Sequence, residues 1–375
     1  MGGRHLPGRS PPGGGFIWLL VAVASVGPGC VEAGSTVRQG EIVYGADDRV
    51  DYFELADERA RALVAASVVA LVPNEVIQST GGVLARAPTW ADGADLCAGE
   101  PFADQPAAAF CSGVLVDWDL VLTAGHCTRL LAIQDFKVVF GYYFAEPGRL
   151  AATANDIVPI AEIVAERLDP EGTEPRLDYA WLRLEQPVRA PRQPAFVHVA
   201  PPALELGDPV ISVGAPGGVP LKWDAGGHVQ DTRAQWSDYF TVDADNSGGS
   251  SGGGAFDQQL SVLGVVSRGG TDFFTTAAGC NSTFREADTA KAAEQFTYAF
   301  RAVSALCGSP GRTRSICRPD CGSPCQALPA VEQSEGGCAV AGGGSGWCWR
   351  SNWLPLLLGF LYLWRPHRFF QPKRC

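Results

Sequence analysis

The sequence predicts an all-β fold, either a barrel or a sandwich, that ends in one C-terminal helix. Short apolar runs of strand length recur with glycine, proline and aspartate between them, which is typical of antiparallel sheets. These runs lie at residues 67–72, 111–116, 120–123, 136–140, 157–164, 179–184, 209–213, 240–242 and 260–266. A proline-rich stretch at 187–202 divides the runs into two halves. Residues 289–306 carry apolar side chains at helical spacing and predict an amphipathic closing helix.

The composition predicts a folded protein from an oxidising compartment. The chain has 375 residues, of which 46% are apolar and 18% charged, enough to bury a substantial core. A net charge of -11 offers no basic surface for nucleic acid, so we expect none as a partner. The 12 cysteines lack zinc-ligand spacing and predict disulfides. We expect neither a metal nor a cofactor.

The first residues predict export. Arg4 and Arg9 precede an apolar run at 16–26, so we interpret residues 1–30 as a secretory signal peptide. Cys30 follows the run directly and could carry a lipid, although Gly27 departs from the usual lipoprotein pattern. Residues 31–59 are interpreted as a pro-segment or N-terminal extension. The protein is therefore expected to be secreted, and retained at the bacterial cell surface or outer membrane where an anchor operates.

One stretch, residues 110–127, suggests the chemistry. Two apolar runs joined by a turn hold His126 between Cys111 and Cys127, which could be bridged across the hairpin. A histidine can take and return a proton near neutral pH. The string Leu-Thr-Ala-Gly-His-Cys, with Phe-Cys-Ser-Gly upstream, resembles the histidine motif of chymotrypsin-fold serine peptidases.

The resemblance covers residues 60–305 and implies two six-stranded antiparallel β-barrels. These barrels would span about 60–187 and 188–288, with the closing helix at 289–306. The histidine would act as the general base of a serine nucleophile, held in place by an aspartate. The chain must then supply these two partners.

Asp178 is the predicted aspartate. It opens Asp-Tyr-Ala-Trp-Leu-Arg-Leu184, which resembles the segment that carries the triad aspartate in this family. An aspartate entering an apolar strand is well placed to be buried against an imidazole. Asp169 is a nearby rival, but a proline follows it and no such strand does.

Three serines compete in the glycine-rich stretch 246–254. The family pattern Gly-x-Ser-Gly-Gly falls on residues 249–253 and assigns the nucleophile to Ser251 rather than Ser247 or Ser250. The resemblance also implies an oxyanion hole made by the amides of Gly249 and Ser251, in a turn that few side chains tolerate.

One departure from trypsin bears on activation. Ile42-Val-Tyr-Gly45 is similar to the start of mature trypsins, whose freed amine pairs with an aspartate just before the serine. Here Ser250 stands in that place, so activation by a new N-terminus is not expected and the stretch fits an N-terminal strand or turn better. The pattern at 214–218 together with 249–251 resembles the bacterial glutamyl endopeptidase branch.

Substrate specificity is expected from two places. Asp245 lies six residues before Ser251, the spacing of the acidic pocket base in trypsins, which would favour Arg or Lys. Ser267-Arg268-Gly269 is similar to the edge that binds the substrate backbone by strand addition, where Arg268 would favour acidic substrates. Cys97 and Cys280 could join the two halves, although the connectivity is not derivable from sequence.

The last part of the chain differs in character. Residues 307–346 are rich in Cys, Gly and Pro and predict a stalk. Residues 347–375 combine the apolar run 353–364 with a basic end, and with Cys338 they resemble the MYXO-CTERM class of surface-sorting signals. Membrane anchoring through 353–364 is expected on this interpretation, and a disordered basic tail is the alternative.

The sequence thus predicts a secreted or surface-anchored serine endopeptidase that acts on proteins or peptides through His126, Asp178 and Ser251. The first alternative is a catalytically inactive relative that binds protein through the same cleft. The second is a surface-display module whose tail is the functional part. The sequence does not determine the oligomeric state.

Overall fold

The computed structural model describes residues 43–77, 87–291, 294–308 and 315–317. The predicted signal peptide with Cys30, most of the stalk, Cys338 and the run 353–364 lie outside these residues. Within the described part, none of the helices combines the length and the apolar character needed to cross a membrane. The predictions about export and anchoring therefore stay predictions.

The first half of the fold is one antiparallel sheet in the order β10-β11-β5-β4-β3-β6-β9. Its strands are β3 (Val68–Pro73), β4 (Cys111–Asp117), β5 (Leu120–Thr123), β6 (Phe136–Val139), β9 (Ile157–Val158), β10 (Ile160–Leu168) and β11 (Asp178–Leu184). The edge strands β9 and β10 are consecutive in the chain, with only Pro159 between them. The sheet therefore curves until its two edges meet at this proline.

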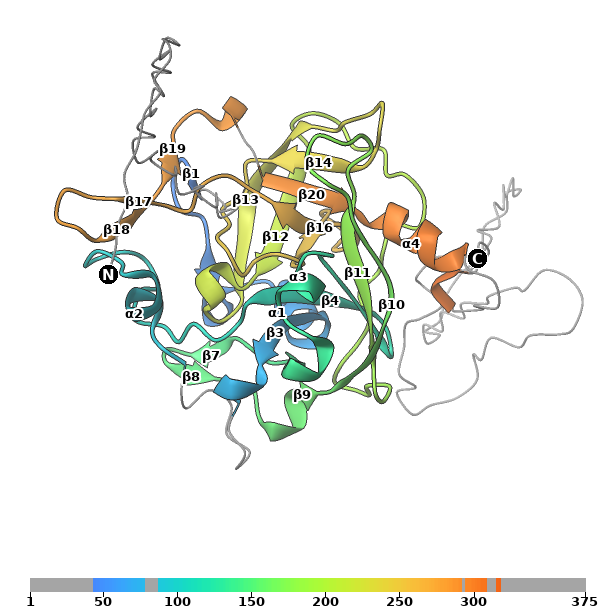
Figure 1. The fold of residues 1–375 in the computed structure, drawn as a ribbon, viewed down its shortest axis with the longest axis horizontal. Helices are drawn as coiled ribbons and strands as arrows, with labels where there is room; N and C mark the ends of the chain where they lie inside the picture. The colour runs from blue at the N-terminus through green and yellow to red at the C-terminus, as the bar shows by residue number, and fades with distance from the viewer. Residues whose placement is uncertain (1–42, 78–86, 292–293, 309–314, 318–375) are drawn as a thin grey trace, which may run out of the picture. The chain divides into compact units, whose positions relative to one another are not determined.

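The second half closes fully by hydrogen bonding. Its strands are β12 (Pro209–Gly214), β13 (Lys222–Asp231), β14 (Tyr239–Val242), β15 (Gly254–Phe256), β16 (Val262–Arg268) and β20 (Glu294–Tyr298). They follow the order β12-β15-β16-β20-β14-β13, and β13 also pairs with β12, which completes a six-stranded barrel. In Figure 1 the blue-to-green first half lies below the yellow-to-orange second half. The predicted all-β fold in two antiparallel halves is confirmed.

Smaller elements complete the architecture. Six further strands form short pairs: β1 (Val43–Tyr44) with β19 (Arg285–Glu286), β7 (Phe144–Glu146) with β8 (Arg149–Leu150), and β17 (Phe273–Thr275) with β18 (Asn281–Thr283). The helices are α1 (Glu58–Ser67), α2 (Trp90–Ala94), α3 (Cys127–Leu130) and α4 (Ala299–Cys307). Helix α2 lies in the long connection between β3 and β4.

The closing helix is shorter than predicted. The prediction placed it at 289–306, whereas the structure has strand β20 at Glu294–Tyr298 and begins α4 at Ala299. Phe296 and Tyr298 alternate into the core of the second barrel, and β20 is hydrogen-bonded between β14 and β16. Pairing on both sides stabilises the strand, which the local helical spacing could not reveal.

The N-terminal extension also differs from its prediction. Residues 31–59 were expected to form a pro-segment or extension, but the part from Val43 onward is built into the fold. Strand β1 pairs in parallel with β19, and a further strand, β2 (Val50–Asp51), pairs with β13 of the second barrel. Asp57 then caps α1 by accepting the Arg59 N–H at 2.7 Å.

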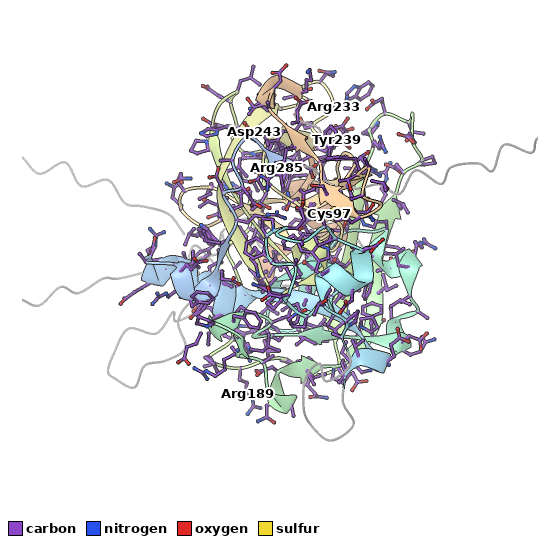
Figure 2. All side chains as sticks on the ribbon, turned by 90° about the vertical axis from the view of Figure 1, so that its left-hand side faces the viewer. Cys97, Arg189, Arg233, Tyr239, Asp243 and Arg285 are labelled. Atoms are coloured by element: carbon purple, nitrogen blue, oxygen red, sulfur yellow. A yellow bond between two sulfur atoms is a disulfide. The ribbon has the colours of Figure 1, made fainter. Side chains whose placement is uncertain are left out.

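One disulfide joins segments that are distant in sequence, and a second closes a short loop at the end of α4. Cys97, which follows α2, is bonded to Cys280 between β17 and β18, and Cys307 at the end of α4 is bonded to Cys317. Figure 2 shows Cys97 near the middle of the molecule, with Arg189 of the connection between the halves at the bottom.

Arg233 and Tyr239 of the second half lie at the top of Figure 2. The guanidinium of Arg233 lies 4.4 Å from the centroid of the Tyr239 ring.

Helix α4 is attached to the first half through Trp181. This side chain is fully buried on β11, and its indole N–H donates to the Ala302 carbonyl at 3.0 Å. Figure 1 shows α4 beside the orange end of β20, to the right of β10 and β11. The bond thus connects the strand that begins at Asp178 with the last helix.

We expect Trp181→Phe to lower the free energy of unfolding by about 1–3 kcal/mol. The phenyl ring leaves the buried Ala302 carbonyl without its donor and opens a small cavity. Urea denaturation followed by circular dichroism measures the change. Trp236→Phe, at a side chain that is 38% exposed, is the matched control and should stay within about 0.5 kcal/mol of the wild type. Equal effects of the two substitutions would contradict this role of the buried bond.

Candidate active site

His126 is held at the start of α3, directly after β5. The preceding Gly125 is pressed against the neighbouring strands, because an added Cβ would lie 2.3 Å from the Arg167 carbonyl oxygen and 2.9 Å from that of Tyr179. Cys127 is bonded to Cys111 on β4, so the turn is also tied from its other side. The turn that carries the imidazole is therefore fixed on both sides.

Asp178 lies beneath this turn as the first residue of β11. Its carboxylate accepts the backbone N–H of His126 on Oδ1 at 3.0 Å, and the ring Nδ1 of His126 on Oδ2 at 2.9 Å. The Asp178 side chain is 1% exposed and that of His126 is 23% exposed. Since an ionised carboxylate can only accept, Nδ1 carries the hydrogen, and Nε2 is left as the basic nitrogen.

The rival aspartate faces other groups. Asp169 Oδ1 accepts the Arg167 Nε–H at 2.9 Å, and its Oδ2 accepts the Leu177 N–H, also at 2.9 Å. It therefore organises the connection between β10 and β11. Of the two aspartates that the sequence offered, the structure brings Asp178 to His126.

The serine stretch separates its three candidates by exposure. Ser247 and Ser250 are each 1% exposed. Ser247 Oγ donates to the Asn246 carbonyl, and Ser250 Oγ is buried without a hydrogen-bond partner in the described part of the chain. Ser251 is partly exposed, and its carbonyl oxygen lies 2.7 Å from the Ser112 nitrogen and 3.6 Å from Cys127 Sγ. Ser251 thus stands next to the disulfide that flanks His126.

Gly249, the predicted oxyanion-hole residue, has a backbone conformation that favours glycine. Its φ of +108° and the lack of space exclude a side chain, because a Cβ would lie 2.5 Å from the Ala215 carbonyl oxygen and 2.7 Å from the Gly218 nitrogen. Among the hydrogen bonds of the described residues, none is donated by the Gly249 N–H. The glycine-rich turn at 214–218, which the sequence singled out, is the surface against which this loop packs.

Ser112 connects the histidine hairpin to the serine loop, a role that sequence reasoning missed. Its N–H donates to the Ser251 carbonyl at 2.7 Å, and its hydroxyl donates to the Gly249 carbonyl at 2.9 Å. The same hydroxyl accepts the Ala215 N–H at 2.9 Å. The Phe-Cys-Ser-Gly string that pointed to the family contains this serine.

Asp245 does not form the base of an open pocket. Its two carboxylate oxygens accept the backbone N–H groups of Tyr44 at 2.7 Å and Asp48 at 2.8 Å, and the residue is only 3% exposed. Both oxygens of the predicted acidic group are thus occupied by backbone donors, and a preference for Arg or Lys substrates stays a prediction. The spacing to Ser251 could not reveal that a segment about 200 residues upstream covers the carboxylate.

The same segment brings a buried cation behind the serine loop. Arg49 is 4% exposed, donates to Asp47 at 2.7 Å and approaches Ser247 Oγ at 3.3 Å. Nearby, Asp224 accepts the Asp245 N–H at 2.7 Å. Burial raises the pKa of Asp224 to about 6, and burial together with the Asp224 charge raises the pKa of Asp245 to about 7. We use the name N-terminal clasp for the group formed by Tyr44, Asp47, Asp48, Arg49, Asp224 and Asp245.

The predicted substrate edge points partly inward. Ser267 is 1% exposed and its hydroxyl donates to the Gln295 carbonyl at 3.0 Å, while Gly269 follows the end of β16. Arg268 is 5% exposed, with Nη2 lying 3.5 Å from Asp178 Oδ2. Its guanidinium is buried against Asp178 and is not displayed on the outer side of the edge, so a preference for acidic substrates stays a prediction.

One cluster has the composition of a metal site. Ligand atoms of Cys111, His126 and Cys127 lie within 4.8 Å of one another. The two sulfurs are bonded to each other and offer no thiolate to an ion. The cluster is therefore assigned to the disulfide and the histidine that it positions.

A comparison with protein families agrees with this fold. A family profile described as a trypsin-like peptidase domain matches residues 111–265, which is less than half of the chain. The matched segment supports a chymotrypsin-like fold and a serine protease type of function, and a peptidase domain implies protein or peptide substrates. No curated protein matches the sequence.

Among solved structures, the chain is similar to kallikrein-related peptidase 10 with a TM-score of 0.34 and 15% identity. The alignment covers 53% of this chain and 88% of that one. A likeness at this level carries no argument about function.

We expect Ser112→Ala to destabilise the serine loop. The substitution removes two buried hydrogen bonds and leaves the Gly249 carbonyl and the Ala215 N–H without a partner, at a cost of about 1–3 kcal/mol. Hydrogen exchange monitored by mass spectrometry should show faster exchange in peptides spanning 246–254. Ser282→Ala, in the β17–β18 hairpin, is the control and should leave that segment unchanged. Unaltered exchange in Ser112→Ala would contradict the connecting role.

The N-terminal clasp should give a pH-dependent stability. Asp224 and Asp245 have folded pKa values above the unfolded value of 3.8. Their contribution to stability is therefore fully present below about pH 4 and is lost as the pH rises through about 6 to 7. Asp224→Asn removes one charge, so between about pH 4.5 and about pH 7.5 the variant should lose less unfolding free energy than the wild type.

Urea denaturation at the two pH values measures this difference. The Asp224→Asn substitution places an amide where a carboxylate accepted two N–H groups, but that cost is the same at both pH values and cancels in the comparison. The control is Asp104→Asn, at an exposed aspartate, which should follow the wild type. A loss equal to that of the wild type in Asp224→Asn would show that the buried charges do not govern the pH dependence.

Proposed function

We propose that the protein is a serine endopeptidase of the chymotrypsin fold that hydrolyses peptide bonds through an acyl-enzyme on Ser251. The observation that supports this most strongly is the buried Asp178 carboxylate, which holds both the backbone and the ring of His126. A histidine oriented in this way has its second ring nitrogen available as a general base. The partly exposed Ser251 lies beside the Cys111–Cys127 disulfide, which flanks His126.

In the proposed reaction, the Ser251 hydroxyl attacks the substrate carbonyl carbon while His126 Nε2 takes its proton. Asp178 stays ionised and stabilises the resulting imidazolium. The negative oxygen of the tetrahedral intermediate accepts from the amides of Gly249 and Ser251. His126 then returns the proton to the leaving amine, the C–N bond breaks, and water repeats the sequence to release the acid.

We further propose that the N-terminal clasp takes over the task of a freed N-terminal amine. Backbone N–H groups of Tyr44 and Asp48 bind Asp245, and neither group is a terminal amine. The clasp then shapes the serine loop without cleavage before Ile42. Since the N–H groups of Tyr44 and Asp48 occupy the Asp245 carboxylate, a preference for Arg or Lys through that residue is not part of the proposal. The likeness to glutamyl endopeptidases stays a prediction.

We also propose that the protein is secreted. Three disulfides join described residues, which favours an oxidising compartment. Surface retention through Cys30 or residues 353–364 remains part of this proposal, as does the sorting role of the tail. Mass spectrometry of the mature protein from culture fractions would identify both ends and any lipid.

A fluorophosphonate probe tests the proposed nucleophile. We expect the wild type to form one covalent adduct and Ser251→Ala to form none, because the phosphorus is attacked only by an activated serine. His126→Ala should slow labelling by about 10³-fold or more. Peptide mapping of the adduct places it on Ser251, and Ser304→Ala, on an exposed position of α4, is the control that should label normally.

The same experiment separates the inactive alternative. A folded wild-type protein that forms no adduct would favour a protein-binding relative without catalysis. An adduct that persists in Ser251→Ala would overturn the assignment of the nucleophile. A peptide-library cleavage profile then determines which side chains the substrate pocket accepts.

A further inference from the structure

We propose that Arg268 is a positioning residue that tunes the proposed base by sharing the Asp178 carboxylate with His126. The inference rests on the proposed function, because it concerns the residues given catalytic roles there. It also goes beyond it, since the proposed mechanism assigns no task to a cation at Asp178. The contacts that support it come from three separate segments of the chain.

The two partners of Asp178 meet at one oxygen. His126 Nδ1 lies 2.9 Å from Oδ2, and Arg268 Nη2 lies 3.5 Å from the same Oδ2. The other oxygen, Oδ1, accepts the His126 backbone N–H. Asp178 and Arg268 are 1% and 5% exposed at their side chains, so little water screens this pair.

The surroundings of Arg268 make Asp178 its principal partner. Arg268 Nη2 also lies 3.5 Å from the Asp169 carbonyl oxygen, and Nη1 is buried without a hydrogen-bond partner among the described residues. Asp169 uses its carboxylate to bind Arg167 and Leu177, as described above. A buried guanidinium is costly unless a carboxylate compensates it, and Asp178 is the acid that it approaches.

The other charged and titratable groups around Arg268 are few. Arg176, which precedes β11, and Tyr239 on β14 act on it electrostatically together with Asp169. On β20, Glu294 turns its Oε1 to the Gly270 N–H. Burial lowers the pKa of Arg268 while Asp178 raises it, and an arginine still keeps its charge throughout the pH range of proteins.

The sign of the effect follows from Coulomb's law. Protonation of His126 places a second positive charge, on the imidazole ring, beside the carboxylate oxygen that Arg268 already approaches. The guanidinium charge repels that added charge across the shared oxygen, so removing the guanidinium should make protonation of the His126 ring easier.

Arg268→Met tests the proposal because it keeps an unbranched side chain that can stay buried and removes the charge. The midpoint of the His126 titration, followed by NMR of the ring nitrogens, should rise by about 0.5–1 unit. His126→Ala identifies the signal among the five histidines. The acidic limb of the labelling rate with the fluorophosphonate should move by the same amount, so labelling well below the midpoint becomes about 3- to 10-fold slower.

Three further variants complete this test. Arg268→Lys keeps a positive charge and should restore most of the wild-type midpoint. Arg183→Met, which removes a cation from β11 that pairs with Glu162 at 3.1 Å, is the matched control and should leave the midpoint unchanged. Arg268→Gln also removes the charge while keeping a donor, and it repeats the test should the methionine variant not fold.

A folded Arg268→Met or Arg268→Gln with an unmoved or lowered midpoint would overturn the proposal. So would a shift of equal size in Arg183→Met. If neither neutral variant folds while Arg268→Lys does, the Arg268 charge serves the stability of the fold, and the proposal is overturned as well. The NMR titration needs no activity, so a wild type that is never labelled refutes the proposed function and leaves this test intact.

Discussion

The buried carboxylate of Asp178 is the group on which the geometry of the site depends. Removing a carboxylate from water costs several kcal/mol unless donors compensate it, and His126 supplies two of these donors from one residue. The compensation holds only while the turn after β5 stays against the start of β11. Gly125, which has no room for a side chain, and the disulfide at Cys127 keep the turn there.

The serine loop is held by interactions of a different kind, which come from three directions. Ser112 binds it from the first half, the turn at 214–218 supports Gly249 from the second barrel, and the N-terminal clasp closes it from behind. Backbone N–H groups can bind a buried carboxylate as a terminal ammonium does, but they need no cleavage of the chain. The first described residues of the chain are therefore part of the structural basis of the loop.

The sequence could predict those parts of the fold and site that depend on short stretches of chain. The place of His126 between strands, and the aspartate that opens an apolar strand at 178, follow from local patterns. The partners of Asp245 could not be predicted, because the contact with Tyr44 depends on how two distant segments fold together. The same holds for β20, whose helical spacing was outweighed by strands on both sides, and for Arg268, whose place on β16 did not reveal an inward direction.

Two buried arginines give the site its electrostatic character. Arg49 stands behind the serine loop among Asp47, Asp224 and Asp245, and Arg268 stands beside Asp178. The negative charge of Asp178 is thus partly compensated before any substrate arrives, so it can stabilise an imidazolium less than an unpaired carboxylate would. In the proposed reaction, the amides of Gly249 and Ser251 must then supply a larger share of the stabilisation, by binding the developing oxyanion. The rigidity of the loop that carries these amides is therefore as important as the basicity of His126.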